Sequence, residues 1–312
     1  MVALGGGRTT LVASWLAAWA LLVPFCALAQ YNGVDPYEEY AQRISAAQVV
    51  APESDSIFGD NVSLYSGSTT FEVTDASIPG NNALPVALRR IFVIQDHRGA
   101  VAGITLRGFG DWDLDVPYIV GTFTTQNGWT LTASGATDRC SDNNPTDWPD
   151  TVVPIPSGTG TAPIQDVWHG NVLHIPGAGN QNLLANTQTN SPAYASAGTY
   201  KWVTSGNWRL RCIASVSNMS GEGFVAVSPE GVSYTFNYAV TRGAPLFEYR
   251  YASNITTPAG VARENIYLLA THVQDRFGNW VNYNYSNGNL ASITSSDGRT
   301  ITLNWSGAPS AR

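Results

Sequence analysis

Three groups of residues in this 312-residue chain have types and spacings that could support chemistry. The first is the run Asp111-Trp112-Asp113-Leu114-Asp115, whose three carboxylates fall on one side of an extended strand. Several carboxylate oxygens on a flexible segment are what calcium prefers. The glycine and distal glutamate of an EF-hand loop are not in register, however. We therefore favour the alternative, a solvent-facing strand whose Trp112 and Leu114 point inward.

The second group comprises four aspartates near Cys140 and Trp148, namely Asp138, Asp142, Asp147 and Asp150. A carboxylate pair beside a tryptophan is the arrangement in which a glycosidase holds its acid, its base and a platform for the sugar. Aspartate is also an ordinary loop residue, and we interpret this segment as a surface loop.

The third group is His169 and His174, which flank Gly170-Asn171. Five positions apart on a strand, the two imidazoles point to opposite faces, so shared metal ligation is disfavoured. Serine-hydrolase, zinc-protease, phosphate-loop and dinucleotide motifs are absent. The sequence therefore predicts no catalytic residue, no cofactor and no metal site, and a chain that is not an enzyme.

The first 29 residues have the organisation of a secretory signal peptide. Arg8 precedes an apolar run over residues 11–23, and Ala27-Leu28-Ala29 forms a small-x-small cleavage site. A retained membrane anchor is the alternative, but Pro24 breaks the helix. No second long apolar run follows. We expect an exported chain, in the periplasm, on the cell surface or outside the cell, with no membrane span after cleavage.

Cys140 and Cys212 are the two cysteines beyond that segment. In an exported chain they could form one disulfide or remain two separate thiols. Two cysteines alone do not hold a structural zinc.

Composition favours strands and excludes a nucleic-acid partner. Charged residues make up 12% of the chain, against about 25% in ordinary globular proteins. The net charge is −7, and Lys201 is the one lysine, so the basic footprint of a nucleic-acid binder is missing. Aromatic and β-branched runs alternate with turn signals, which predicts an antiparallel all-β architecture. Asp35-Pro36 predicts the start of one short amino-terminal helix.

An internal repeat is the strongest pattern in the chain. Three segments align from a glycine: Gly231–Tyr238, Gly278–Tyr285 and Gly298–Trp305. Apolar or aromatic residues stand three, five and seven places after each glycine, and Asn or Thr stands at the intervening places. A strict period of two predicts a strand with one aromatic face and one Asn/Thr face. Asn287-Gly288 predicts a type I′ hairpin turn.

The residues of this repeat resemble those of a known protein family. The run Leu268–Tyr285, with Gly288–Ile293 and Asp297-Gly298, resembles the YD (tyrosine-aspartate) repeat of RHS (rearrangement hot spot) proteins, which joins an Asp-x-x-Gly-Asn turn to a Tyr-x-Tyr strand. Upstream, three segments are similar to the opening of RHS proteins, including a Leu-Pro-x-x-Leu-x-Arg strand: Asn61–Gly67, Phe71–Asp75 and Ile78–Arg90.

The resemblance implies a curved or spiral antiparallel sheet of hairpin repeats that begins a hollow β-shell. In the family such a shell encloses a cargo, commonly a polymorphic toxin. We expect a signal peptide over 1–29, a short helix and linker over 30–55, an RHS-like amino-terminal β region over 56–255 and about two YD repeats over 256–312. The chain then resembles the amino-terminal part of a longer RHS protein.

Three functions follow as hypotheses. The first is a non-catalytic structural segment that starts the shell. The second is a β module whose exposed aromatic and Asn side chains bind cell-surface carbohydrate. The third, and least favoured, is a secreted carbohydrate-active enzyme. Because Ile301, Leu303 and Trp305 fall on the last strand with no lysine nearby, we also expect edge-to-edge self-association.

Overall fold

The computed structural model describes residues 60–62, 69–94, 112–130, 138–144, 148–155, 158–186, 199–249 and 259–305. The chain divides into two compact units, Met1–Tyr31 and Asn32–Arg312, and every described residue belongs to the second. The predicted signal peptide, the predicted helix at Asp35, and the residues Asp111 and Asp147 lie outside the described residues. Within them the fold is antiparallel β with a single helix of four residues, α3 (Ile164–Val167), which confirms the predicted class.

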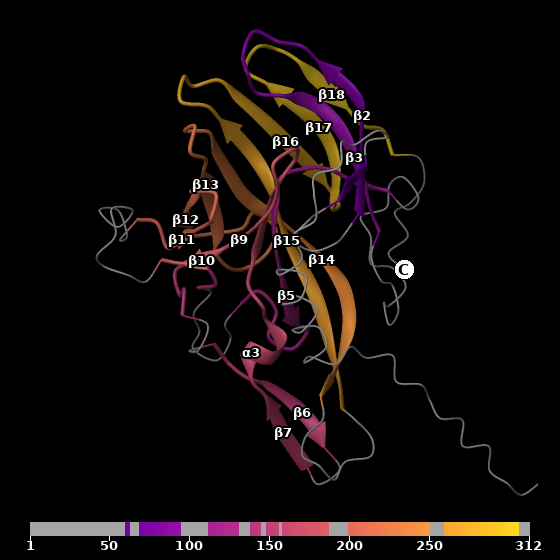
Figure 1. Cartoon of the computed structure of the whole chain (residues 1–312), viewed down its shortest axis with the longest axis vertical. Coiled ribbons are helices and arrows are strands. Elements are labelled where there is room, and N and C mark those ends of the chain that lie inside the picture. The colour runs from indigo at the N-terminus through magenta and orange to yellow at the C-terminus, as the bar shows by residue number, and fades with distance from the viewer. Residues whose placement is uncertain are drawn as a thin grey trace, which may run out of the picture. The chain divides into compact units, whose positions relative to one another are not determined.

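The strands form one small sheet, one hairpin and one large sheet (Figure 1). The small sheet has the order β1 (Asp60–Val62), β2 (Thr69–Ile78), β3 (Val86–Ile94) and β4 (Asp113–Leu114). The hairpin pairs β6 (Thr151–Ile155) with β7 (Gly158–Ala162). The large sheet runs through β10 (Leu184–Ala185), β11 (Trp202–Val203), β12 (Arg209–Ile213), β13 (Gly223–Val227), β14 (Ser233–Tyr249), β15 (Ala259–Gln274), β16 (Trp280–Ser286), β17 (Asn289–Ser295) and β18 (Thr300–Thr302), with β5 (Tyr118–Thr124), β8 (Val172–Ile175) and β9 (Gly179–Asn182) on a side branch.

The large sheet forks at β15. One edge of this strand pairs with β14, whereas the other edge pairs with β5 over Arg263–Leu269 and with β16 over His272–Gln274. The first branch continues from β5 to β8 and β9. Only Leu183 separates β9 from β10, and β10 pairs with β11, so this branch returns to the main sheet and gives a nearly closed, barrel-like ring.

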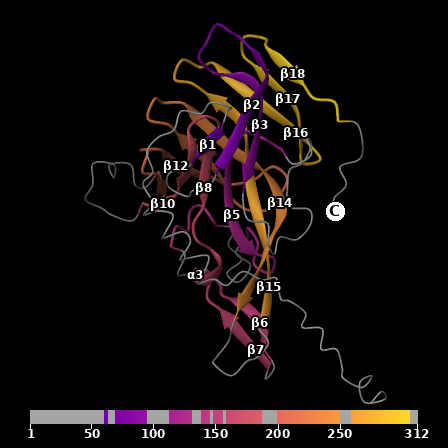
Figure 2. The same cartoon turned by 45° about the vertical axis from the view of Figure 1, so that its right-hand side comes forward.

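Two apolar cores fill the space on either side of β14 and β15. The first lies inside the ring and contains Phe123, Trp202, Leu210, Phe224 and Phe236, each with 1% or less of its surface exposed. The second lies between the small sheet and the other branch, β16 to β18, which the views show beside β2 and β3 (Figures 1 and 2). Its members include Val86, Leu114, Val281, Leu290 and Ile293. The two sheets are therefore held together by buried apolar side chains from both.

The three aligned repeats share one turn. The glycine N–H donates to the carbonyl three residues earlier, at 3.0, 3.2 and 3.0 Å for Gly231, Gly278 and Gly298. A second hydrogen bond runs from the N–H of that earlier residue to the carbonyl of the residue that follows the glycine. Its lengths are 2.8 Å for Ser228 N to Val232 O, 3.0 Å for Asp275 N to Asn279 O and 3.0 Å for Ser295 N to Arg299 O. The glycines have φ of +85°, +88° and +86°, which a side chain would strain. This is the hairpin with a left-handed bulge residue, and β14, β16 and β18 each begin two residues after it.

The predicted alternation holds in β16 and β18 but fails in β14. Val281, Tyr283 and Tyr285 belong to the second core, while Asn284 is exposed on the opposite face. The predicted type I′ turn is confirmed, because Asn287 and Gly288 have φ of +50° and +80° between the paired residues Ser286 and Asn289. In β14, by contrast, Phe236 lies in the first core and Tyr238 in the second. Register shifts flank Phe236, and these irregularities turn its ring to the other side of the sheet.

An ion pair in the last repeat turn holds the loop that joins β2 to β3. Arg299 Nε donates to Asp297 Oδ1 at 2.8 Å, and its Nη1 donates to the carbonyls of Ile78 and Leu84, both at 3.2 Å. Asp297 in turn accepts a hydrogen bond from Asn81 N at 3.3 Å. Two segments more than 200 residues apart are therefore fixed to one another.

This ion pair predicts a specific loss of stability in acid. Hydrogen bonds from Arg299 and Ser295 hold the pKa of Asp297 well below its usual range. Because the unfolded carboxyl titrates near about 3.9, its stabilising contribution is complete above that pH and is lost as the pH falls below it. We expect Asp297→Asn to lower the melting temperature at pH 7, and we expect its difference from the wild type to shrink steadily as the pH is lowered from about 4 toward 2. Thermal melts across this range test the expectation, and a difference that does not change with pH would contradict it.

Candidate functional site

A cavity of about 250 Å³ lies between the small sheet and the large sheet. Its apolar wall includes Leu84, Ala87, Ile175, Val273 and Val281. Its polar lining consists of Thr74, Ser77, Arg89, Asp115, Tyr234 and Tyr283. Concave sites with an apolar wall and a few convergent polar groups are where small molecules bind proteins, so this cavity is the candidate functional site.

Strand register explains why these residues meet. On the small sheet, Thr74 pairs with Arg89 and Ser77 pairs with Ala87, so each pair shares a face. On the large sheet, Tyr234 pairs with Val273 and Val273 pairs with Val281. Tyr283 is two residues beyond Val281, on the same face of β16. The opposing faces of the two sheets thus supply the two walls.

A buried charge network forms one end of the cavity. The side chain of Asp115 is fully buried, and its two oxygens lie 2.7 Å from His174 Nε2 and 3.2 Å from Arg89 Nε. Arg89 Nη2 donates to Glu72 Oε2 at 2.7 Å. The second ring nitrogen of His174, Nδ1, lies 2.8 Å from Asn180 Oδ1. The carboxylate is therefore paired with a guanidinium and an imidazole where water cannot solvate it.

The surroundings of His174 leave it no free nitrogen. Both ring nitrogens have partners, and the ring stacks on Tyr118 with centroids 4.6 Å apart. A general base needs a free nitrogen within reach of the proton that it removes. His174 is accordingly held as a structural partner of Asp115. His169 comes two residues after the end of α3 and is not one of the hydrogen-bond partners of His174.

The prediction that the carboxylates of the Asp111–Asp115 run face solvent is wrong for Asp115. Leu114 is buried as expected, but Asp115 is buried as well. Asp113 lies 3.3 Å from Arg242 Nη1, and the Arg242 guanidinium lies 4.3 Å from the centre of the Tyr267 ring. Arginines from β3 and β14 therefore occupy the carboxylates that a calcium ion would need, and local sequence cannot show cations that arrive from distant strands.

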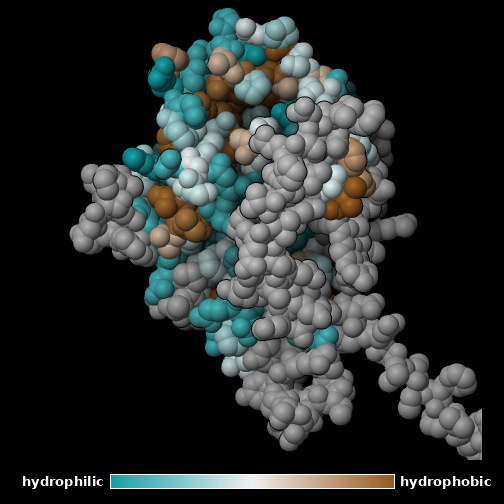
Figure 3. Space-filling view, viewed as in Figure 1, coloured by the Kyte–Doolittle hydropathy of each residue, from teal (hydrophilic) through white to brown (hydrophobic). Residues whose placement is uncertain are grey.

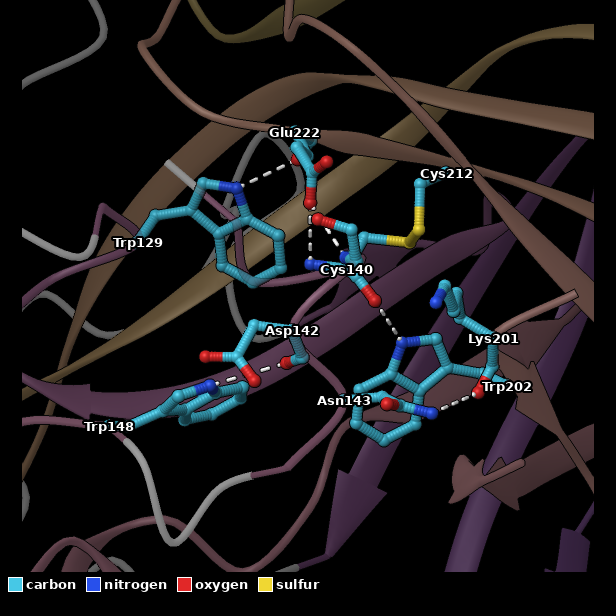
Figure 4. Close-up of a disulfide and its surroundings, with 10 residues drawn as sticks. Trp129, Cys140, Asp142, Asn143, Trp148, Lys201, Trp202, Cys212 and Glu222 are labelled. Carbon is cyan, nitrogen blue, oxygen red and sulfur yellow. Dashed lines mark hydrogen bonds between the residues drawn. A yellow bond between two sulfur atoms is a disulfide. The ribbon is translucent and has the colours of Figure 1, made fainter. Parts of the chain in front are cut away.

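The second predicted group surrounds a disulfide. Cys140 and Cys212 are bonded to one another, which decides between the two alternatives (Figure 4). Asp142 contributes its carbonyl, which accepts from Trp148 Nε1 at 3.2 Å. The Asp150 carboxylate accepts from Ile164 N at 3.1 Å. The described aspartates of this group thus serve loop hydrogen bonds.

Hydrogen bonds tie the disulfide loop to the main sheet. Trp202 Nε1 donates to the carbonyl of Cys140 at 2.8 Å, and the Glu222 carboxylate accepts from Cys140 N at 3.0 Å and from Ser141 N at 2.7 Å (Figure 4). Cys140, Cys212 and Glu222 are the one group of three potential metal ligands found among the described residues. Their two sulfurs are already joined to one another, so this group is a structural crosslink.

Sequence reasoning missed three features. Arg139 is fully buried between the rings of Phe123 and Trp148, at 4.6 and 4.3 Å, and burial lowers its pKa to about 9. Arg89 belongs to the Leu-Pro-x-x-Leu-x-Arg segment, and that pattern gives no sign that Arg89 pairs with Asp115. Tyr283 falls on the predicted aromatic face of its strand, and the alternation gives no sign that this face borders a cavity.

No family model matches this chain, and no curated protein does either. Among the residues that the structure describes, no helix has the length and apolar character needed to span a membrane.

Proposed function

We propose that this chain is a non-catalytic structural segment of an exported RHS/YD-repeat protein, in which it starts a β-shell. The observation that carries the proposal is the recurrence of one turn at Gly231, Gly278 and Gly298, each followed by a strand that contributes to the core. Repeated hairpins bury their apolar faces only against their neighbours, so a series of them builds a continuous wall.

The contact between the two ends of the described region supports the same proposal. The loop 79–84 belongs to the amino-terminal segment that resembles the opening of RHS proteins, and it is fixed by Arg299 and Asp297 of the last repeat turn. A shell that begins at its amino-terminal sheet needs that sheet to be held against the first repeats, and this contact does so. Because both nitrogens of His174 have partners and Asp115 is paired with Arg89, the described site also favours a non-catalytic role.

A growing wall requires an edge that accepts the next strand. Leu303 N donates to Ala291 O at 2.9 Å, and Ser295 N donates to Arg299 O at 3.0 Å. Since antiparallel hydrogen bonds alternate, the backbone N–H and C=O groups of Thr300 and Thr302 point away from β17. In the described part of the chain β18 pairs with β17 alone. This edge is also the surface for the expected self-association.

Extending the chain tests the proposal. We expect that a second copy of residues 275–305, fused after Trp305, pairs with β18, slows amide exchange at Thr300 and Thr302 by at least tenfold, and raises the melting temperature. Hydrogen exchange measured by mass spectrometry and thermal melting are the readouts. A fused segment of the same composition in scrambled order is the control. Equal exchange in both fusions would refute the growing edge.

Carbohydrate binding is the second candidate function, but its candidate binding site is the cavity and not the exposed faces of the repeat strands. The repeat tyrosines and Trp305 pack in the second core, so they do not form an exposed aromatic row. On the face shown in Figure 3, hydrophilic residues with smaller apolar areas between them cover the described surface near β2, β17 and β18. The cavity, where tyrosine hydroxyls meet an apolar wall, is the feature that favours this candidate.

A further inference from the structure

The disulfide loop brings a third potential metal ligand to the two cysteines. The two sulfurs and a carboxylate oxygen of Glu222 all lie within 4.8 Å of one another. Cys140 is fully buried, whereas Cys212 and Glu222 are half-buried. Figure 4 shows the Glu222 carboxylate directed at the backbone of Cys140, beside the disulfide. A disulfide alone needs no carboxylate beside it, so the three groups have a capacity beyond the crosslink.

Strand register and loop hydrogen bonds position the three groups without help from the S–S bond. Cys212 on β12 pairs with Phe224 on β13, and Glu222 precedes Phe224 by two residues, so it lies diagonally from Cys212. The backbone of Cys140 donates to the Glu222 carboxylate at 3.0 Å and accepts from the Trp202 indole at 2.8 Å. None of these contacts involves a sulfur atom. Reduction of the disulfide therefore leaves two thiols and a carboxylate held in one place.

The geometry of the three groups suits a tetrahedral metal ion. Glu222 Oε2 accepts from Cys140 N and Ser141 N, which orient the carboxylate, while Oε1 accepts no hydrogen bond from any described residue. Zn–S bonds of about 2.3 Å hold two sulfurs roughly 3.8 Å apart in a tetrahedral site. The Cα atoms of Cys140 and Cys212 are 5.5 Å apart, so rotation about the two Cα–Cβ bonds gives the sulfurs that separation.

The ligand types favour zinc over the other common divalent cations. Calcium and magnesium take at least about six oxygen ligands, which one carboxylate does not supply. Thiolate and carboxylate groups together are zinc ligands, and a site with three protein ligands leaves the fourth position to water. Two thiolates and one carboxylate also supply the negative charge that a divalent cation needs.

We propose that the reduced form of this chain binds one zinc ion through Cys140 Sγ, Cys212 Sγ and the Glu222 carboxylate. Zinc and the disulfide are then alternative crosslinks of the loop 138–144, so the loop stays fastened to the sheet in oxidising and in reducing surroundings. This inference goes beyond the structural role and is independent of it.

Two steps convert one crosslink into the other. The first thiol of a dithiol reductant attacks one sulfur and frees the other cysteine as a thiol. Its second thiol then displaces the remaining cysteine and closes a cyclic disulfide, so that two electrons and two protons pass to the chain. Zinc replaces the two thiol protons, which go to the solvent.

Cobalt and zinc titrations of the full chain test the inference. Every sample carries Cys26→Ser, so that Cys140 and Cys212 supply all of the thiols. The chain is reduced with a water-soluble phosphine, which takes up an oxygen atom from water and adds no thiol of its own. We expect the reduced chain to bind one equivalent of Co²⁺, seen as a thiolate-to-cobalt charge-transfer band, and Zn²⁺ to displace it. The oxidised chain should give no such band.

Two carboxylates of the same region provide the matched variants. Glu222→Gln removes one ligand, while its amide oxygen can still accept from Cys140 N and Ser141 N. We expect it to bind zinc at least about tenfold more weakly, the loss that even a group outside the ligand set causes. Asp142→Asn neutralises a carboxylate of the same loop that lies outside the ligand group, and it should bind zinc as the wild type does. Cys140→Ser should abolish tight binding.

Near-ultraviolet circular dichroism of the reduced, metal-free chain distinguishes a folded site from thiols on an unfolded chain. Loss of the tertiary signal on reduction, absence of the charge-transfer band at millimolar cobalt, or equal zinc affinity of the Glu222→Gln and Asp142→Asn variants would each overturn the inference. A rise in the urea midpoint of the reduced chain on addition of zinc, absent when both Cys140 and Cys212 are serine, would support it. None of these results bears on the fusion experiment, which tests the growing edge through amide exchange.

Discussion

Replacing Cys140 and Cys212 together by serine is expected to lower the free energy of unfolding by about 4 kcal/mol. The disulfide closes a loop with a sequence separation of 72 residues. In the chain-entropy treatment, a loop of that length gives roughly 4 kcal/mol at 25 °C, because the crosslink removes conformations from the unfolded chain. A loss of that size is a large part of the total stability of an ordinary domain.

Urea unfolding followed by tryptophan fluorescence measures this effect. Trp202 donates to the carbonyl of Cys140 and the disulfide loop borders the first core, so the probe reports the region concerned. Wild-type protein treated with a thiol reductant should unfold at the same urea concentration as the double variant. A loss below 1 kcal/mol, or a reduced wild type that differs from the variant, would contradict the assignment of the stabilisation to the crosslink.

The sequence predicted those parts of the fold that depend on local rules. Glycine spacing located three turns, since only glycine adopts their left-handed φ without strain, and Asn287-Gly288 identified the type I′ hairpin. The side of the sheet to which the Phe236 ring points could not be predicted in this way. Side chains along β14 should point alternately to the two faces of the sheet, but the Phe236 ring does not follow this order. Register shifts occur on both sides of Phe236, and those shifts depend on how β14 pairs with β15.

The site could not be predicted, because it is made between sheets. Asp115 and His174 are 59 residues apart, and they meet because β5 pairs with β8 and Asp115 lies three residues before the start of β5. Arg89 reaches the same carboxylate from β3, where the N–H of Asp115 also donates to the Arg89 carbonyl at 2.9 Å. Periodicity assigns a residue to a face but not to the partners across that face. A run of three aspartates therefore predicts a solvent-facing strand, with calcium ligation as the less favoured reading, whereas its last member is buried between Arg89 and His174.

Asp115→Ala is expected to destabilise the protein by about 3 kcal/mol. Removing the buried carboxylate leaves His174 Nε2 without its hydrogen-bond partner at 2.7 Å, and leaves Arg89 without the negative charge that lies 3.2 Å from its Nε. Breaking a fully buried pair costs about 3–5 kcal/mol, and the lower end applies here because the Arg89 side chain is 27% exposed. Asp115→Asn should cost less, since an amide oxygen can still accept from His174.

The neighbouring arginine supplies the matched control. Arg90 follows Arg89 on β3 and pairs with Asp75, through Nη2 at 2.7 Å from Oδ1, but the two side chains are 26% and 28% exposed. Water can replace either partner there, so Asp75→Ala should cost less than 1 kcal/mol. Urea unfolding of both variants compares two aspartate–arginine pairs that differ mainly in the burial of the carboxylate. If the two losses were equal, burial of Asp115 would not be what makes its pairing important.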